Sequence, residues 1–184
     1  MIIGVAGTIA SGKGELGNIL VERGFKRLSL SDEIRDMMRK KGMDLTRDSL
    51  TVFADSMRKS EGAGFWARRI ISKMIPGANY VIESIRNPAE VEEFRKIDGF
   101  FLVGVDAPVQ LRFERTAARA REQDPQRFTD FLMIDARDRG VGQQDYGQQN
   151  ARVLDMTDLI IMNDGTIEDF RKKVLFFLER LQKD

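Results

Sequence analysis

Five short apolar runs stand out along the chain, and the stretches between them carry apolar residues at helical spacing. The runs are nearly continuous and rich in Ile, Val and Phe, which is typical of parallel strands buried on both faces of a sheet. They cover residues 2–6, 25–30, 80–85, 100–105 and 159–162. Because the predicted strands alternate with predicted helices, the pattern indicates an α/β fold.

Capping residues and glycines mark where the predicted helices begin and end. Ser31-Asp32 and Asn87-Pro88 are expected to start helices, and Gly24 and Gly42 to end them. Two segments, 35–75 and 112–149, do not fit the alternation of strand and helix. We expect them to be insertions that contain moving parts.

Two apolar features have alternative interpretations. Trp66, in the first insertion, offers a surface for stacking on a base, but its helical spacing with Ile70 and Met74 favours a place in the core. The C-terminal apolar stripe is expected to pack against the sheet, with a partner surface as the alternative. It comprises Phe170, Val174, Phe177 and Leu178.

The composition limits the classes of function. Among 184 residues, 30 are basic and 29 acidic, so the net charge is +1 and we expect neither general nucleic-acid binding nor membrane binding. The chain contains no Cys and no His, which excludes thiol nucleophiles, His general bases and metal sites built on either residue. With no signal peptide and no long apolar run, a cytoplasmic protein is expected.

The segment from Gly7 to Gly14 follows the first predicted strand and opens a predicted helix. Gly7 and Gly12 are separated by four residues and are followed by Lys13. Phosphate binding needs inward-pointing backbone N–H groups, the positive end of a helix and a lysine, and this spacing supplies all three. A turn without a ligand would not require the lysine. We therefore expect ATP to bind through Gly7, Thr8, Ile9, Ala10, Ser11, Gly12, Lys13, Gly14 and Glu15.

One position departs from the usual phosphate loop. Gly14 follows Lys13, where a Ser or Thr hydroxyl normally binds Mg²⁺. The ion then needs a water or another ligand nearby, for which the candidates are Ser11, Glu15 and Asp32. Glu83, at the end of the third predicted strand, is expected to orient a water bound to Mg²⁺. Its alternatives are a helix cap or an ion pair with Arg86.

Charged residues follow the second and third predicted strands. In a parallel sheet the ligand lies beyond the carboxyl ends of the strands, so these residues should be close together. We expect Asp32, Arg35 and Arg86 to bind the acceptor of a phosphoryl group. Arg35 and Arg86 each suit a bidentate grip on an acceptor phosphate, and surface ion pairing is the alternative, above all for Arg35.

Arginines recur after the fourth predicted strand. The first group lies on one predicted helix and comprises Arg112, Arg115, Arg119 and Arg121. Such a stripe is usually solvated, but here it precedes the turn Asp124-Pro125 and a second group formed by Arg137 and Arg139. Two arginine groups therefore bracket one loop, as a lid that closes over phosphates requires.

These motifs resemble the adenylate-kinase-like branch of the P-loop nucleoside monophosphate kinases. Asp32-Glu-Ile-Arg35 matches the Asp-x-x-Arg segment of that family, and Arg115 and Arg119 match the Arg-x-x-x-Arg that opens its lid. Glu83-Ser-Ile-Arg86 is similar to Asp-Gly-Phe-Pro-Arg, one residue shorter and with Glu for Asp. Segments 84–94, 112–115 with Asp124-Pro125, and 158–165 most closely resemble small ATPases described as adenylate-kinase-related or dephospho-CoA-kinase-like, which also tolerate Gly after the loop lysine.

The resemblance implies a three-layer P-loop sandwich, with a five-stranded parallel sheet between two layers of helices. It implies one kinase domain over residues 1–184, with a core of 1–31, 76–111 and 150–184. Residues 32–75 would form the monophosphate-binding insertion and 112–149 the arginine-rich lid. Asn163 and Gly165 would lie near the adenine through backbone contacts. The sequence does not indicate an oligomeric state, and we expect a monomer or a weak dimer.

Three functions remain open. The first choice is a kinase that uses ATP and Mg²⁺ to phosphorylate a small phosphorylated acceptor, a nucleoside or deoxynucleoside monophosphate, and the Asp-x-x-Arg spacing favours it. Its catalytic residues would be Lys13, Arg115, Arg119 and Arg137. The second is a dephospho-CoA kinase, in which Asp32 would act as general base on a ribose hydroxyl. The third is an ATP-driven switch or assembly factor whose lid movement is read by a partner.

Overall fold

Five parallel strands form the centre of the protein. The structure is a computed structural model and describes residues 1–119 and 124–181. Within these residues the strands are β1 (Ile2–Gly7), β2 (Lys26–Ser29), β3 (Tyr80–Glu83), β4 (Phe100–Asp106) and β5 (Leu159–Met162). They pair in the order β2-β3-β1-β4-β5, each pair parallel. This confirms the predicted five-stranded parallel sheet and places β1 at its centre.

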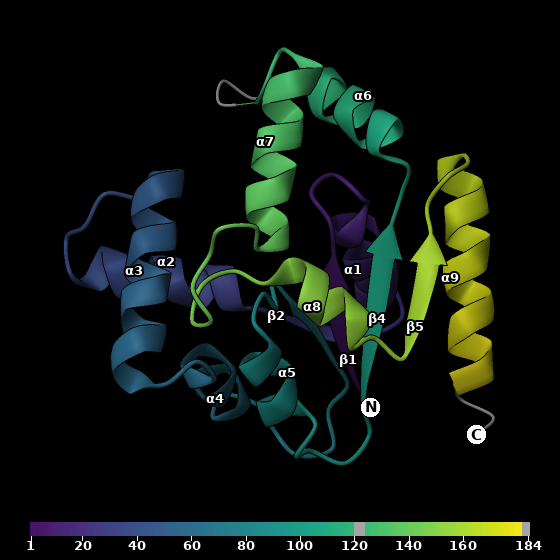
Figure 1. The fold of residues 1–184 in the computed structure, drawn as a ribbon. Helices are drawn as coiled ribbons and strands as arrows, with labels where there is room; N and C mark the ends of the chain where they lie inside the picture. The colour runs from purple at the N-terminus through teal and green to yellow at the C-terminus, as the bar shows by residue number, and fades with distance from the viewer. Residues whose placement is uncertain (120–123, 182–184) are drawn as a thin grey trace.

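Helices cover both faces of the sheet (Figure 1). One face carries α1 (Lys13–Glu22) and α9 (Ile167–Leu181). The other carries α2 (Leu30–Lys40), α3 (Arg47–Glu61), α4 (Phe65–Ile71), α5 (Pro88–Phe94) and α8 (Asn150–Asp155). Beyond the carboxyl ends of the strands lie α6 (Val109–Arg119) and α7 (Phe128–Arg139). The three-layer arrangement predicted from the resemblance is confirmed.

Two apolar cores, one on each face, hold the layers together. In β1, Ile3 and Val5 pack with α1 and α9, whereas Ile2 and Ala6 pack into the core on the opposite face. A strand covered on both faces has no polar side, which explains the continuous apolar runs in the sequence. The C-terminal stripe of α9 is buried against the sheet, as predicted; it comprises Phe170, Val174, Phe177 and Leu178.

The predicted ends of the helices are confirmed in most places. Asn87 caps α5 in a capping box, and Gly24 and Gly42 have positive φ angles of 88° and 67° just after α1 and α2. The expected cap at Ser31-Asp32 is wrong, because α2 begins at Leu30 and its cap is Ser29. The Ser29 hydroxyl accepts a hydrogen bond from the backbone N–H of Asp32 at 3.3 Å. Strand β2 therefore runs directly into the helix that carries the predicted acceptor residues.

The helical insertion between β2 and β3 has its own aromatic centre. Trp66 is fully buried, and its indole N–H donates to the carbonyl oxygen of Ala54 at 3.2 Å. The Phe65 ring packs edge-on against it, with centroids 4.9 Å apart. The interpretation of Trp66 as a core residue is confirmed. This packing holds α4 against α3, and α3 forms one wall of the cleft described below.

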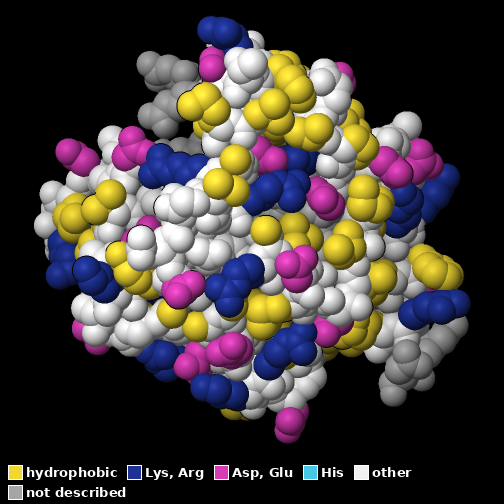
Figure 2. All heavy atoms as spheres, viewed as in Figure 1, with side chains coloured by type: hydrophobic (Ala, Val, Ile, Leu, Met, Phe, Trp, Pro, Cys, Tyr) yellow, Lys and Arg dark blue, Asp and Glu magenta, His cyan; other side chains and the backbone are white. Residues whose placement is uncertain are grey.

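The surface mixes charges of both signs. Figure 2 shows Lys and Arg side chains interspersed with Asp and Glu over the face in view, in keeping with the net charge of +1. None of the described helices is long and apolar enough to cross a lipid bilayer. Arg121, expected on the arginine-rich helix, lies outside the described residues.

Candidate functional site

The loop between β1 and α1 has the backbone geometry of a phosphate-binding loop. Gly7, Ala10 and Gly12 have φ angles of 153°, 58° and 106°. A Cβ atom on Gly7 would lie 2.2 Å from the Val105 carbonyl oxygen, and one on Gly12 would lie 2.2 Å from the Asn163 side-chain nitrogen. Gly7 is therefore required by close packing against backbone as well as by its conformation, and Gly12 by its positive φ angle.

Side chains from the neighbouring strands hold this loop in place. The Thr8 hydroxyl donates to the Asp106 carboxylate at the end of β4, at 2.7 Å. The Asn163 amide, just after β5, donates to the carbonyl oxygen of Ser11 at 2.9 Å. Asn163 and Gly165 were expected near a base through their backbones. The Asn163 side chain contacts the loop itself, and Gly165 is exposed.

Lys13 lies over the loop with its ammonium group turned toward backbone carbonyls. Its Nζ donates to the carbonyl oxygens of Gly7 and Thr8 at 3.0 and 2.6 Å. Burial lowers the pKa of Lys13 from 10.5 to about 8; the Asp138 carboxylate opposes this shift and the Arg86 guanidinium adds to it. A buried ammonium between these charges gains from an anionic ligand.

Three side-chain atoms in the described residues are sealed from solvent and form no hydrogen bond: Ser11 Oγ, Glu83 Oε1 and Arg115 Nη1. A buried polar atom without a partner is costly, and native proteins contain few of them. All three belong to residues that the sequence assigned to nucleotide, metal or phosphoryl binding. Unsatisfied hydrogen-bonding capacity is therefore concentrated in the predicted site.

Glu83 packs against the first turns of α1. A Cβ atom on Gly17 would lie 1.9 Å from Glu83 Oε1, so the glycine makes room for the carboxylate. The expected alternative of an ion pair with Arg86 is wrong, because Glu83 lies 3.6 Å from Arg27 instead. Burial raises the pKa of Glu83, and Arg27 counteracts it. Gly14 precedes Gly17 by three residues and thus lies on the same side of the helix.

A cleft of about 620 Å³ opens beside the phosphate loop. Its walls come from the loop, α2, α3, the end of β3 and the segment that contains α6 and α7. Four predicted site residues with basic side chains line it together: Lys13, Arg35, Arg86 and Arg119. Asp32 does not line the cleft, since its side chain is 68% exposed and pairs with Arg35 at 2.8 Å.

Arg86 is held from both its backbone and its side chain. Its backbone N–H donates to Glu90 Oε2 at 2.8 Å, and the buried Glu90 also binds Arg58 at 2.9 Å. Its Nη1 donates to Gln148 Oε1 at 2.9 Å and to Asp138 Oδ1 at 3.3 Å. Neither Asp138 nor Gln148 was found from the sequence. Asp138 lies between Arg137 and Arg139, and no local pattern distinguishes it from a surface carboxylate.

The arginines of α6 have three different environments. Arg112 is 1% exposed and donates to Asp135 at 2.5 and 3.0 Å, to the Ile9 carbonyl oxygen at 3.2 Å and to the Ala107 carbonyl oxygen at 3.1 Å. Arg112 is therefore not part of a solvated stripe, because its donors are occupied by the protein. It joins the phosphate loop to β4 and α7.

Arg115 and Arg119 extend from the same helix toward the loop and the cleft. Arg115 donates to Asn163 Oδ1 at 3.2 Å, and burial lowers its pKa. Arg119 binds both oxygens of Asp124 at 2.8 Å. Glu15 lies in the first turn of α1, where Asn18 donates to it at 3.4 Å.

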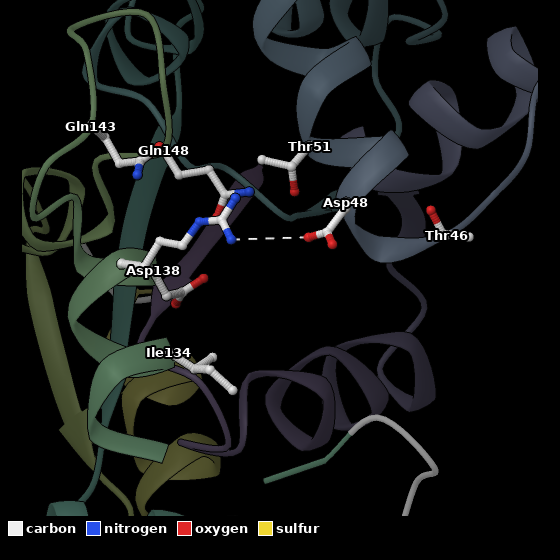
Figure 3. Close-up of a pocket in the computed structure, with 8 residues that line it drawn as sticks. Thr46, Asp48, Thr51, Ile134, Asp138, Gln143 and Gln148 are labelled. Carbon is white, nitrogen blue, oxygen red and sulfur yellow. Dashed lines mark ion pairs between the residues drawn. The ribbon is translucent and has the colours of Figure 1, made fainter. Parts of the chain in front are cut away.

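Arg137 lies apart from the other basic residues of the predicted site. It is 3.9 Å from Asp48 of α3, an ion pair drawn dashed in Figure 3, across a second cavity of about 340 Å³. It does not line the cleft together with Lys13. The two cavities adjoin, because Thr51, Asp138 and Gln148 line both.

Known proteins share this sequence and architecture. A family model described as an AAA domain matches residues 3–138. A UPF0200 protein of Sulfurisphaera tokodaii is 32% identical over 180 residues, which cover 98% of this chain and 97% of the relative. A second, from Pyrococcus horikoshii, is 32% identical over 181 residues, 95% of this chain and 94% of the relative. The chain belongs to the UPF0200 family and carries an AAA domain.

Solved structures of small-molecule kinases have a similar fold. A shikimate kinase from Acinetobacter baumannii, in complex with shikimate, superposes with a TM-score of 0.56 at 18% identity, covering 97% of this chain and 93% of the kinase. A gluconokinase from Sinorhizobium meliloti superposes with a TM-score of 0.56 at 15% identity, covering 97% of this chain and 91% of the gluconokinase. The predicted resemblance thus holds at the level of a P-loop kinase-like fold. The relatives above are UPF0200 proteins rather than adenylate kinases.

Replacing Arg112 with Met should lower the free energy of unfolding by about 3–5 kcal/mol, because Asp135 would lose a buried partner. The matched control is Arg152→Met, which removes an exposed arginine paired with Asp145 and should change stability by less than about 0.5 kcal/mol. Urea denaturation of the two variants measures the difference. Equal free energies of unfolding for the two variants would show that the contacts of Arg112 do not stabilise the site.

Proposed function

We propose that this protein transfers the γ-phosphoryl group of ATP to a small phosphorylated acceptor in the cleft beside the phosphate loop. The observation that carries the proposal is the group of sealed, unsatisfied atoms on Ser11, Glu83 and Arg115. They offer a hydroxyl donor, a carboxylate and a cationic donor around one loop. Phosphoryl transfer needs positioning and charge stabilisation of this kind more than covalent chemistry.

The triphosphate of ATP would occupy the loop from Gly7 to Gly14. The backbone N–H groups at the start of α1 and the positive end of the helix favour an anion there. Lys13 would exchange its carbonyl partners for phosphate oxygens, and Ser11 Oγ would donate to another. Asn163 and Gly165 would border the adenine through their backbone, while the Asn163 side chain keeps its contact with the loop.

The residues around the loop fit a Mg²⁺ ion bound together with ATP. The described residues contain no cluster of three acidic side chains for a metal, and Mg²⁺ on a nucleotide commonly uses only one or two carboxylates besides phosphates and water. Glu83 offers an oxygen without a hydrogen bond, and nothing lies within 4 Å of a Cβ atom placed on Gly14. Asp32 is the second candidate. The ion would neutralise charge on the β- and γ-phosphates.

Lys13, Arg115, Arg119 and Arg137 are the proposed catalytic residues. Arg119 lines the cleft with Lys13 and would exchange Asp124 for a phosphate oxygen. Residues 112–149 would act as the lid and 32–75 as the acceptor-binding insertion. Closure of the lid would then have to bring Arg137 from the second cavity toward the phosphates.

A nucleoside or deoxynucleoside monophosphate is the first acceptor to test, since Arg35 and Arg86 line the same cleft from α2 and from the segment after β3. Dephospho-CoA is the second. The observation that favours it is the Asp138 carboxylate beside Arg86, because a carboxylate attracts a hydroxyl and repels a phosphate.

With Mg²⁺ and ATP, one class of acceptor should raise the rate of ADP release at least about tenfold over the rate without acceptor, because binding orients the reacting groups. A coupled ADP-release assay with the nucleoside and deoxynucleoside monophosphates and dephospho-CoA measures this. Lys13→Met should abolish the acceleration. Slow hydrolysis that no acceptor accelerates would contradict the kinase and support an ATP-driven switch.

Arg35 and Arg39 form a matched pair on α2, because each binds an Asp three residues earlier and only Arg35 lines the cleft. Arg35→Ala should raise the KM of the acceptor at least about tenfold and leave the KM of ATP unchanged, since a charged hydrogen bond to phosphate is lost. Arg39→Ala should change neither. Equal effects of Arg35→Ala on both substrates would contradict its assignment to the acceptor.

The lowered pKa of Lys13 makes ATP binding sensitive to pH. Below about pH 8 the ammonium is charged before ATP binds, whereas above it the free protein must first take up a proton. Above about pH 7 the phosphates of ATP hold constant charge, so the Kd for ATP should rise roughly tenfold per pH unit above 8. Calorimetric titration from pH 7 to 9.5 tests this. Lys13→Met should bind more weakly and without this dependence; a flat wild-type profile contradicts the assignment.

A further inference from the structure

The carboxylate of Asp138 lies between the proposed ATP residues and the proposed acceptor residues. Asp138 is 8% exposed, and its Oδ1 accepts a hydrogen bond from Arg86 at 3.3 Å. Its Oδ2 accepts none from the described residues and is not sealed from solvent. In Figure 3 the carboxylate points into the space that Thr51 and Gln148 also face. One oxygen is thus fixed on Arg86 while the other is open to a ligand.

The same carboxylate is within electrostatic reach of the phosphate loop. Burial lowers the pKa of Lys13 to about 8, and among the charges that oppose this shift Asp138 is the largest. Asp138 and Lys13 also line the same cleft. An acceptor group bound at Asp138 would therefore lie close to the outer phosphate that Lys13 is proposed to hold.

The other carboxylates near the cleft are less suited to contact an acceptor. Both oxygens of Asp124 accept hydrogen bonds from Arg119. Asp32, which the sequence suggested as a general base, is exposed, pairs with Arg35 and does not line the cleft. Among the carboxylates that line the cleft within the described residues, Asp138 is the one with an open oxygen.

A carboxylate in this place favours an alcohol over a phosphate as the attacking group. A phosphate is largely ionised near neutral pH and needs no base, and its charge would be repelled by Asp138. A hydroxyl, in contrast, must lose its proton during transfer and would donate a hydrogen bond to the open oxygen.

We propose, on the basis of the phosphotransferase function above, that Asp138 is the general base and that the attacking group is a hydroxyl of a phosphorylated polyol such as a ribose. The hydroxyl oxygen forms a bond to the γ-phosphorus as the bond from that phosphorus to the β,γ-bridging oxygen breaks. The bonding electron pair leaves with ADP. The hydroxyl proton passes to Asp138, and a second phosphate on the polyol is held by Arg35.

The second cavity fits the remainder of such an acceptor. Its walls carry the hydroxyls of Thr46 and Thr51 and the amides of Gln143 and Gln148. Among the described residues that line it, Ile134 is the only aliphatic one. Hydroxyls and amides both donate and accept hydrogen bonds, as the several hydroxyls of a polyol require. Because this cavity adjoins the cleft at Asp138, one molecule would reach both.

The first test identifies the bond that is formed. Wild-type protein is incubated with Mg²⁺, ATP and either phosphorylated polyols (dephospho-CoA, ribose 5-phosphate, glycerol 3-phosphate) or nucleoside monophosphates, and the products are read by ³¹P NMR. A new phosphate ester on carbon-bound oxygen is expected. A new phosphoanhydride, that is, a nucleoside diphosphate, would overturn the role of Asp138 but leave the phosphotransferase intact. No transfer to any acceptor, despite ATP binding, would overturn both.

The second test separates a base from a residue that positions Arg86. Asp138→Asn keeps an oxygen for Arg86 and should lower kcat on the best polyol, measured at saturating ATP, at least about 100-fold. The loss of kcat at low pH in the wild type should be absent in this variant, and Asp138→Glu should restore part of the rate. Unfolding temperatures confirm that each variant is folded.

Gln148→Leu is the matched control, because it removes the other partner of Arg86 without removing a base. It should raise the KM of the polyol and retain the loss of kcat at low pH. If Asp138→Asn keeps kcat, or if Gln148→Leu lowers kcat and alters the pH profile as strongly as Asp138→Asn does, Asp138 only positions Arg86 and the proposal is wrong.

Discussion

The geometry of the site depends on the buried guanidinium of Arg112. It binds the Ile9 carbonyl oxygen of the phosphate loop, the Ala107 carbonyl oxygen after β4 and the Asp135 carboxylate of α7. Three segments distant in sequence are thereby fixed to one rigid cation. A planar guanidinium can satisfy several acceptors at once, which an ammonium group does less well. The position of Asp138, one turn from Asp135 on α7, follows from this anchor.

Much of the fold and of the phosphate loop could be predicted because their signals are local. Apolar runs mark the strands, and the spacing from Gly7 to Lys13 reflects needs of backbone and charge within one short segment. The role of Arg112 could not be predicted, since its partners Ile9 and Asp135 are 103 and 23 residues away. The role of Asp138 was missed for the same reason, because it depends on a contact with Arg86, which is 52 residues away.

In the structure, arginines of the cleft are already paired with aspartates. Arg35 is paired with Asp32, Arg119 with Asp124, and Arg86 with Asp138. An arginine in a partly enclosed cleft without a counterion would be costly, so the acidic partners stabilise the protein itself. A ligand phosphate that binds Arg35 or Arg119 must then replace a carboxylate, which reduces the affinity gained from each contact. Such exchange favours ligands that replace several carboxylates together, as a nucleotide and an acceptor would.

The phosphate loop departs from the usual form at Gly14, and Gly17, one turn further along α1, bears on how a metal could be held there. A hydroxyl at position 14 would be the ordinary metal ligand, and without it a Mg²⁺ ion needs a water or another ligand nearby. The structure shows a carboxylate, Glu83, packed against the same side of α1 where Gly17 has no side chain. Burial raises the pKa of Glu83, because it disfavours the charged carboxylate. A nearby cation would offset this cost of burying the charge. Under the proposed function, the two glycines and Glu83 would act as one unit, in which a metal ligand from β3 would replace one from the helix.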